Sequence, residues 1–157
     1  MPRGRAGLII ISLSLLWSVA LLWGAARFVT LPVFTLMPTV MAAFLAPGLV
    51  LALMVARIGW RQRAGRQWRI DRHVLDVTVL QLVLALCIWP GAAVLLGSAG
   101  PGAITVLGVG FVISSLGHWL GAYLSRPLRD LGRAATFAPT MLVALWALAS
   151  AAAYGSG

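Results

Sequence analysis

Residues 31–56 read LPVFTLMPTVMAAFLAPGLVLALMVA, a stretch of 26 residues without a charged side chain. A helix that crosses the hydrocarbon core of a bilayer needs about 20 mostly apolar residues, so this stretch is long enough to span a membrane. Four further apolar stretches of similar length lie at 8–26, 74–97, 103–124 and 134–154. Helices are expected in all five, because every backbone polar group must be paired inside lipid. The sequence therefore predicts an all-α polytopic integral membrane protein with five transmembrane helices.

The composition excludes a soluble domain and several kinds of cofactor chemistry. The chain has 157 residues, of which 61% are hydrophobic and 10% are charged, whereas a soluble domain carries roughly 25% charged residues. Its mean hydropathy is +0.98. It has no lysine, which excludes a retinal or pyridoxal Schiff base and a P-loop. The single cysteine, Cys87, excludes an intrachain disulfide, a cysteine zinc site and a CxxCH haem attachment.

The net charge of +9 comes from arginines that lie between the apolar stretches. They gather before the first stretch, between the second and third, and between the fourth and fifth, and only Arg27 lies in the turn that joins the first two. Because cytoplasmic loops are enriched in arginine, we predict a cytoplasmic N-terminus and a periplasmic C-terminus. This distribution does not favour nucleic acid as a partner. It favours anionic membrane lipids or an acidic protein.

The first apolar stretch follows Arg3 and Arg5, an arrangement that is compatible with a cleaved signal peptide. Its apolar core of 19 residues is long for such a peptide, so we expect a retained helix. The domain prediction is therefore an N-terminal transmembrane helix at 1–30, followed by a four-helix membrane bundle at 31–157.

A polar face is predicted where the third apolar stretch begins. Arg69, His73 and Asp76 are spaced i, i+4 and i+7, so they project from one face of a helix. A cation, an imidazole and a carboxylate on one face could hold a polar ligand through charge-assisted hydrogen bonds. The alternative is a simple helix start, in which Asp71 is the N-cap and Asp76 pairs with Arg72.

His118 is predicted inside the membrane, about 9 Å from the cytoplasmic end of its helix. Gly117 and Gly121 form a GxxxG step that would let another helix approach closely. A hydrogen bond between helices is one expectation for His118. The other is a tetrapyrrole ligand, with Ser114 seating the ring and His73 as a second axial histidine. Apart from that alternative, no metal site is expected.

Three arginines, Arg126, Arg129 and Arg133, surround Asp130 just before the last apolar stretch. One interpretation of these arginines is the usual enrichment of arginine in cytoplasmic segments, together with local ion pairs to Asp130. The alternative is that Arg129 binds an anionic ligand or stabilises a thiolate, because a nearby cation lowers the pKa of a thiol.

Over residues 31–154 the chain resembles a known family, the membrane-associated proteins in eicosanoid and glutathione metabolism (MAPEG). The resemblance rests on the arginine-rich loop and on four segments, which read IDRHVL at 70–75, QLVLAL at 81–86, LGHWLG at 116–121 and PLR at 127–129. The segment AATFAPT at 134–140 is similar to one in bacterial members with five helices.

The resemblance implies a MAPEG-like four-helix bundle, usually trimeric, in a bacterial inner membrane, with the N-terminal helix as an addition. It also implies a glutathione site between subunits near the cytoplasmic side. Arg129 matches the arginine that activates the glutathione thiol in this family.

The chain departs from the family's diagnostic motif, which is arginine, three residues, asparagine, two residues and glutamate. The motif can be aligned in two registers. In the first, its arginine, asparagine and glutamate positions fall on Arg69, His73 and Asp76, and in the second they fall on His73, Val77 and Leu80. We favour the second register, because it aligns the following leucine-rich run, which begins at Gln81, with the corresponding run of the family. In that register the asparagine and glutamate positions are apolar.

Further departures lie in the fourth apolar stretch. Ser115 stands where the family has arginine, and His118 and Ala122 stand where tyrosines contact glutathione. One surviving arginine, Arg129, cannot orient a tripeptide thiol well enough for catalysis. The glutathione site is therefore expected to be degenerate.

These observations predict a non-catalytic helical scaffold or accessory subunit, which assembles with its own copies or with a larger membrane complex. The alternative is a glutathione-dependent transferase or peroxidase that acts on lipophilic substrates. In it, Arg129 would be catalytic, and glutathione would be held by Arg69, His73, Asp76, His118 and Arg126. The third reading is a tetrapyrrole-binding membrane subunit with His118 as the ligand.

Overall fold

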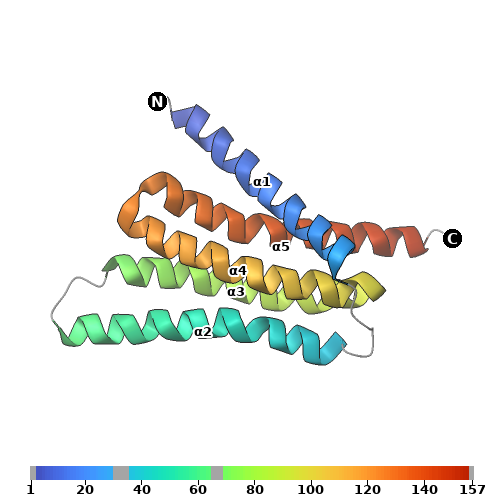
Figure 1. Cartoon of the computed structure of the whole chain (residues 1–157), viewed down its shortest axis with the longest axis horizontal. Coiled ribbons are helices and arrows are strands. Elements are labelled where there is room, and N and C mark those ends of the chain that lie inside the picture. The colour runs from blue at the N-terminus through green and yellow to red at the C-terminus, as the bar shows by residue number, and fades with distance from the viewer. Residues whose placement is uncertain (1–2, 30–35, 65–68, 156–157) are drawn as a thin grey trace.

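The structure is a computed structural model that describes residues 3–29, 36–64 and 69–155. These residues form five long helices and no strand (Figure 1). The helices are α1 (Arg3–Phe28), α2 (Leu36–Arg63), α3 (Arg69–Leu95), α4 (Gly100–Leu124) and α5 (Arg126–Gly155), with a 3₁₀ turn η2 (Gly97–Ala99) between α3 and α4. All five are long and apolar enough to cross a membrane. The prediction of an all-α membrane protein with five transmembrane helices is confirmed.

The helices extend beyond the apolar stretches at their arginine-rich ends. Helix α2 continues to Arg63, α3 begins at Arg69 and α5 begins at Arg126. Arginine is a good helix former, and its long side chain can carry the charge toward water while its stem stays on apolar surface. The arginines are therefore parts of the helices and not only of loops.

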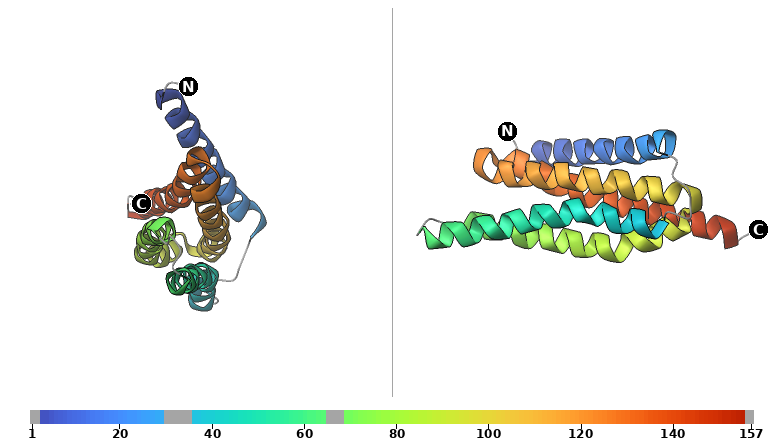
Figure 2. Two further views of the ribbon diagram at one scale, coloured as in Figure 1. Left: turned by 90° about the vertical axis from the view of Figure 1, so that its left-hand side faces the viewer. Right: turned by 60° about the horizontal axis from the view of Figure 1, so that its bottom comes forward.

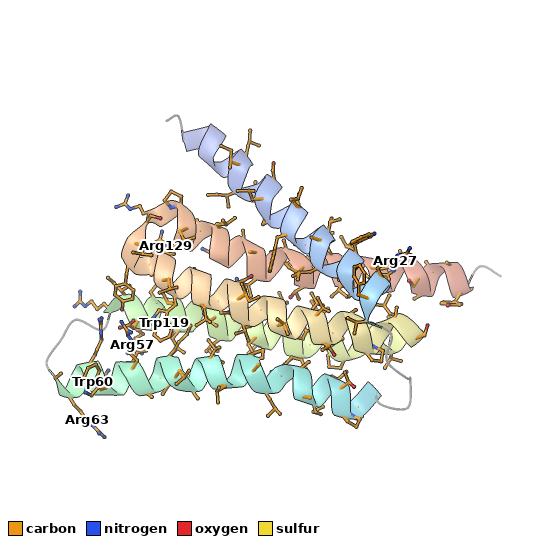
Figure 3. All side chains as sticks on the ribbon, in the orientation of Figure 1. Arg27, Arg57, Trp60, Arg63, Trp119 and Arg129 are labelled. Atoms are coloured by element: carbon orange, nitrogen blue, oxygen red, sulfur yellow. The ribbon has the colours of Figure 1, made fainter. Side chains whose placement is uncertain are left out.

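Five helix ends share one side of the bundle, which we name the arginine-rich end: the starts of α1, α3 and α5 and the ends of α2 and α4 (Figure 1). Figure 3 shows Arg57, Arg63 and Arg129 at this end and Arg27 at the opposite end. The folded chain thus keeps the charge asymmetry that the sequence predicted along its length.

Helix α4 is the central element of the bundle. Of its most apolar window, 61% is buried, against 17–28% in the other four helices. Figure 2 shows α1 and α2 on opposite sides of the bundle, and both contact α4. Its many small residues permit this position, because glycine and serine let neighbouring backbones approach closely.

Two glycines mark the closest contact between α4 and α5. A Cβ atom on Gly121 would lie 2.3 Å from the backbone nitrogen of Arg129, and one on Gly132 would lie 2.4 Å from that of His118. The predicted packing role of Gly121 is confirmed. At Gly117 no described heavy atom outside its own helix lies within 4 Å of the position that its Cβ would take, although its backbone carbonyl carbon lies 3.0 Å from the Cβ position of Gly132 in α5. The backbone of α5 therefore approaches α4 along this GxxxG step, and the Cβ position of Gly121 faces α5 directly, whereas that of Gly117 faces open space.

The apolar core is built around Trp89 of α3, which is 1% exposed. Its ring stacks on Phe44 at 5.2 Å and meets the edge of Phe111 at 6.2 Å. Its indole Nε1–H donates to the Thr140 hydroxyl oxygen of α5 at 3.3 Å. A buried indole needs such a partner inside a membrane, and this bond joins α3 to α5.

Helix α1 lies against α5 and α4, and its first half diverges from α5 (Figure 1). Its two buried serines donate to carbonyl oxygens of their own helix, Ser14 to Ile11 and Ser18 to Ser14. The predicted N-terminal helix therefore packs on the outside of the other four.

Candidate functional site at the arginine-rich end

Asp71 is the only buried carboxylate among the described residues, with its side chain 1% exposed. It accepts hydrogen bonds from Trp119 Nε1, at 3.1 Å, and from the Tyr123 hydroxyl, both on α4. Arg61 Nη1 lies 3.1 Å from its second oxygen, and Arg57 Nε lies 3.7 Å from the first. The expected N-cap role is wrong, because α3 begins two residues earlier, at Arg69.

The two arginines of this cluster also pack on the aromatic rings. The Arg57 guanidinium lies 5.0 Å from the ring centre of Trp119 and 5.4 Å from that of Tyr123. Arg61 lies 5.3 Å from the Tyr123 ring, and its Nη1 donates to the Tyr123 hydroxyl oxygen at 3.0 Å. Such cation–π contacts add to the ion pairs. The Asp71 cluster, as we name these five residues, joins α2, α3 and α4.

Beside this cluster is a small cavity of about 270 Å³, which we name the basic pocket. Its lining residues come from α3, α4 and α5: Arg69, Ile70, His73, Val74, Ala122 and Arg129. Two guanidinium groups and an imidazole thus share a pocket with three apolar side chains. One guanidinium group can donate two parallel hydrogen bonds to the oxygens of a carboxylate or a phosphate. The lining of this pocket therefore suits an anionic group.

Two of the residues predicted as ligand-binding, Arg69 and His73, therefore come together with Arg129, the residue predicted as catalytic. Asp76 does not line the basic pocket, and its side chain is exposed. Three ion pairs among the described residues involve the other two aspartates, Asp71 and Asp130.

Two more predicted residues lie outside the basic pocket. Arg126 is exposed at the start of α5. His118 is 2% exposed, and its Nδ1–H donates to the backbone oxygen of Arg129 at 2.8 Å. The expected interhelical hydrogen bond of His118 is confirmed. Because Nδ1 is the donor, Nε2 carries the lone pair, and this buried atom has no partner among the described residues.

The face of α4 that would seat a tetrapyrrole is covered by α5. Ser114 is buried, and its hydroxyl donates to the backbone oxygen of Ala135 at 3.3 Å. Gly132 of α5 packs on the backbone of His118. This packing takes the place of a ring stacked over Ser114.

The packing also fixes the residues of the basic pocket. Arg129 is held from the α4 side, since Gly121 contacts its backbone nitrogen and His118 binds its backbone oxygen. On α3, Arg69 and His73 flank the buried Asp71 in sequence, so the Asp71 cluster anchors the helical turn that carries them. The packing thus holds the backbone positions that carry the basic groups of the pocket.

Sequence reasoning missed the Asp71 cluster. A signal was present, since Asp71 lies inside the arginine-rich segment between the second and third apolar stretches, two residues after Arg69 and next to Arg72. Its partners are 10 to 52 residues away in the chain, and their spacing on separate helices carries no motif.

No family model, no curated protein and no solved structure matches the chain. The resemblance to the MAPEG family therefore rests on the quoted residues alone.

Proposed function

We propose that the protein is a non-catalytic helical subunit of a membrane assembly, and that its basic pocket binds an anionic group. The observation that carries this proposal is the convergence of Arg69, His73 and Arg129 on one pocket. The ligand is a phosphate or a carboxylate, because these are the groups that two guanidiniums bind best.

The donors of the pocket are available to a ligand. Arg69 and His73 make no hydrogen bond or ion pair with any residue that the structure describes. Arg129 Nε lies 3.2 Å from Asp130, its neighbour in the chain, and both side chains are partly exposed. An ion pair at such exposure contributes little free energy, so it competes only weakly with a ligand.

The apolar side of the pocket favours an anion attached to a lipophilic body. Ile70, Val74 and Ala122 contribute no polar side chain. In the proposed orientation the arginine-rich end faces the cytoplasm of a bacterial inner membrane, where the leaflet is rich in anionic lipid. A lipid phosphate is then the most abundant ligand that fits.

Two observations support a role without catalysis. The asparagine and glutamate positions of the favoured family register are held by Val77 and Leu80, which have no acid–base groups, and Leu80 is 70% exposed. The one nearby carboxylate of the predicted polar face, Asp76, lies outside the basic pocket. Assembly with further copies, a trimer in the family, or with another membrane protein is part of the proposal.

A second candidate function is a glutathione-dependent transferase or peroxidase. The observation in its favour is that Arg129 shares the pocket with Arg69 and His73. Glutathione carries two carboxylates that these groups would bind, and Arg129 would stabilise its thiolate. Thiol-dependent conjugation of 1-chloro-2,4-dinitrobenzene, lost in the Arg129→Ala variant, would establish this candidate and overturn the non-catalytic role.

The binding experiment uses the full chain in detergent and native mass spectrometry. Phosphatidylglycerol, phosphatidylcholine and glutathione are titrated separately. We expect phosphatidylglycerol to bind more tightly than phosphatidylcholine, and the Arg129→Gln and Arg69→Gln variants each to weaken it by about tenfold. The matched control is Arg63→Gln, which removes an exposed charge from the same end outside the pocket. Equal losses in Arg63→Gln and Arg129→Gln would overturn the assignment of the pocket.

A further inference from the structure

The basic pocket gathers more positive charge than a singly charged anion needs. Arg69 and Arg129 line it from different helices, and His73 adds an imidazole one helical turn after Arg69. Arg69 is also the first residue of α3, and Arg129 is the fourth residue of α5. The first turn of a helix carries a partial positive charge, so both helix starts add to the charge of the side chains.

Two carboxylates lie near the basic pocket, and neither lines it. Asp130 lies 3.2 Å from Arg129 Nε, with half of its side chain exposed, and Asp76 is exposed on α3. Exposed charges interact weakly, because water and salt screen them. They offset only part of the positive charge, so the pocket favours a ligand with more than one negative charge.

The number of donor groups separates two classes of phosphate. A phosphate monoester has three unesterified oxygens and a charge of about −1.5 to −2 near neutral pH, whereas a diester has two such oxygens and a single charge. The guanidiniums of Arg69 and Arg129 suffice for two oxygens. The exposed His73 donates at least one N–H in either protonation state. A third oxygen for this donor is present only in the monoester.

The size of the basic pocket favours the same class. Its volume of about 270 Å³ is below the range of about 300–1,000 Å³ that holds drug-sized ligands, so it suits a headgroup and not a whole lipid. A diester lipid brings a headgroup alcohol beside its phosphate, whereas a monoester brings the phosphate alone. The apolar lining residues Ile70, Val74 and Ala122 suit the lipophilic side of such a molecule.

We propose that the basic pocket selects a phosphate monoester, the headgroup of phosphatidic acid, over a phosphodiester. This selectivity rests on the proposed anion-binding function of the pocket and adds the class of the anion. Arg69 and Arg129 bind the phosphate in both classes of lipid, and His73 is the residue that distinguishes them. No covalent step is part of the proposal.

The experiment compares phosphatidic acid with phosphatidylglycerol of the same acyl chains, by native mass spectrometry of the full chain in detergent near neutral pH. We expect phosphatidic acid to bind about tenfold more tightly. His73→Ala should reduce this preference to about twofold, because it removes the third donor and leaves the two guanidiniums. His73→Gln keeps an N–H donor and should retain more of the preference. The matched control is Arg63→Gln, outside the pocket, which should leave the ratio of the two affinities unchanged.

Equal affinities of the natural protein for the two lipids would overturn the selectivity alone, provided that both bind more tightly than phosphatidylcholine and depend on Arg129. A loss of that dependence would overturn the anion site itself. A preference that is the same in His73→Ala as in the natural protein would also overturn the selectivity. Glycerol 3-phosphate carries the same monoester without acyl chains. If it displaces phosphatidic acid at equal concentration, the natural source is a soluble ester, and if it does not, the source is the lipid. Either result supports the monoester class.

Discussion

At the scale of single residues, Asp71 has the most demanding environment in the described chain. Its carboxylate is buried and faces two arginines and two aromatic donors from other helices. Below it, Val50, Met54 and Val74 form an apolar cluster that limits access of water. A buried charge of this kind is tolerated only while its partners remain.

We predict that Asp71→Asn lowers the free energy of unfolding by about 3 kcal/mol, because it removes the buried negative charge that pairs with Arg57 and Arg61. Thermal unfolding in detergent measures the change. The control is Asp76→Asn, which alters an exposed carboxylate on the same helix and should shift the midpoint little. Equal shifts in the two variants would contradict the assigned role of Asp71.

His118 is a positioning residue for Arg129 in this account. We predict that His118→Phe weakens phosphatidylglycerol binding by about fivefold, the value of one hydrogen bond, although its side chain lines no part of the basic pocket. In His118→Asn, the side-chain amide can replace Nδ1–H and should restore binding. If His118→Asn binds phosphatidylglycerol no better than His118→Phe, His118 does not position Arg129 and only fills space between the helices.

At the scale of the elements, the contact between α4 and α5 depends on small residues at defined positions. Gly121 and Gly132 bring the two backbones together, and this contact places Arg129 beside the basic pocket. Gly117 is four residues from Gly121, but its Cβ position is open space at the edge of a cavity between α1, α4 and α5.

We predict opposite effects for alanine at these two glycines. Gly121→Ala places a Cβ against backbone atoms of Arg129 and should cost about 1–3 kcal/mol in stability. Gly117→Ala meets no described atom and should be neutral or slightly stabilising, because alanine favours a helix. Thermal midpoints of the two variants provide the comparison, and a larger loss in Gly117→Ala would contradict the observed packing.

The elements were predictable from the sequence, since apolar length alone sets where a chain can span lipid. Arg69 and His73 were also predictable as one face, because they lie one helical turn apart. The environment of Asp71 was not, because its partners on α2 and α4 come together only through tertiary packing. For the same reason the GxxxG pattern could not show that a side chain has room at Gly117 and none at Gly121.

At the scale of the whole molecule, charge is distributed unequally between the two ends of the bundle. Figure 3 shows Arg27 alone among its labelled arginines at the end opposite Arg129. If the arginine-rich end is cytoplasmic, both the basic pocket and the Asp71 cluster face the cytoplasmic leaflet.

We predict this orientation for single-cysteine variants in a Cys87→Ser background. A membrane-impermeant maleimide should label Ser98→Cys, in the turn η2, in intact cells. It should label Arg63→Cys, at the end of α2, only after permeabilisation. The reverse pattern would place the basic pocket on the outer side and exclude a cytoplasmic-leaflet ligand.

The native mass of the protein after gentle extraction from its own membrane tests the proposed assembly and the proposed anion site together. We expect a mass well above the 16.6 kDa of one chain, with a bound phosphate- or carboxylate-bearing molecule that is lost in Arg129→Gln. A monomer that carries no anion would contradict both the assembly and the function of the basic pocket.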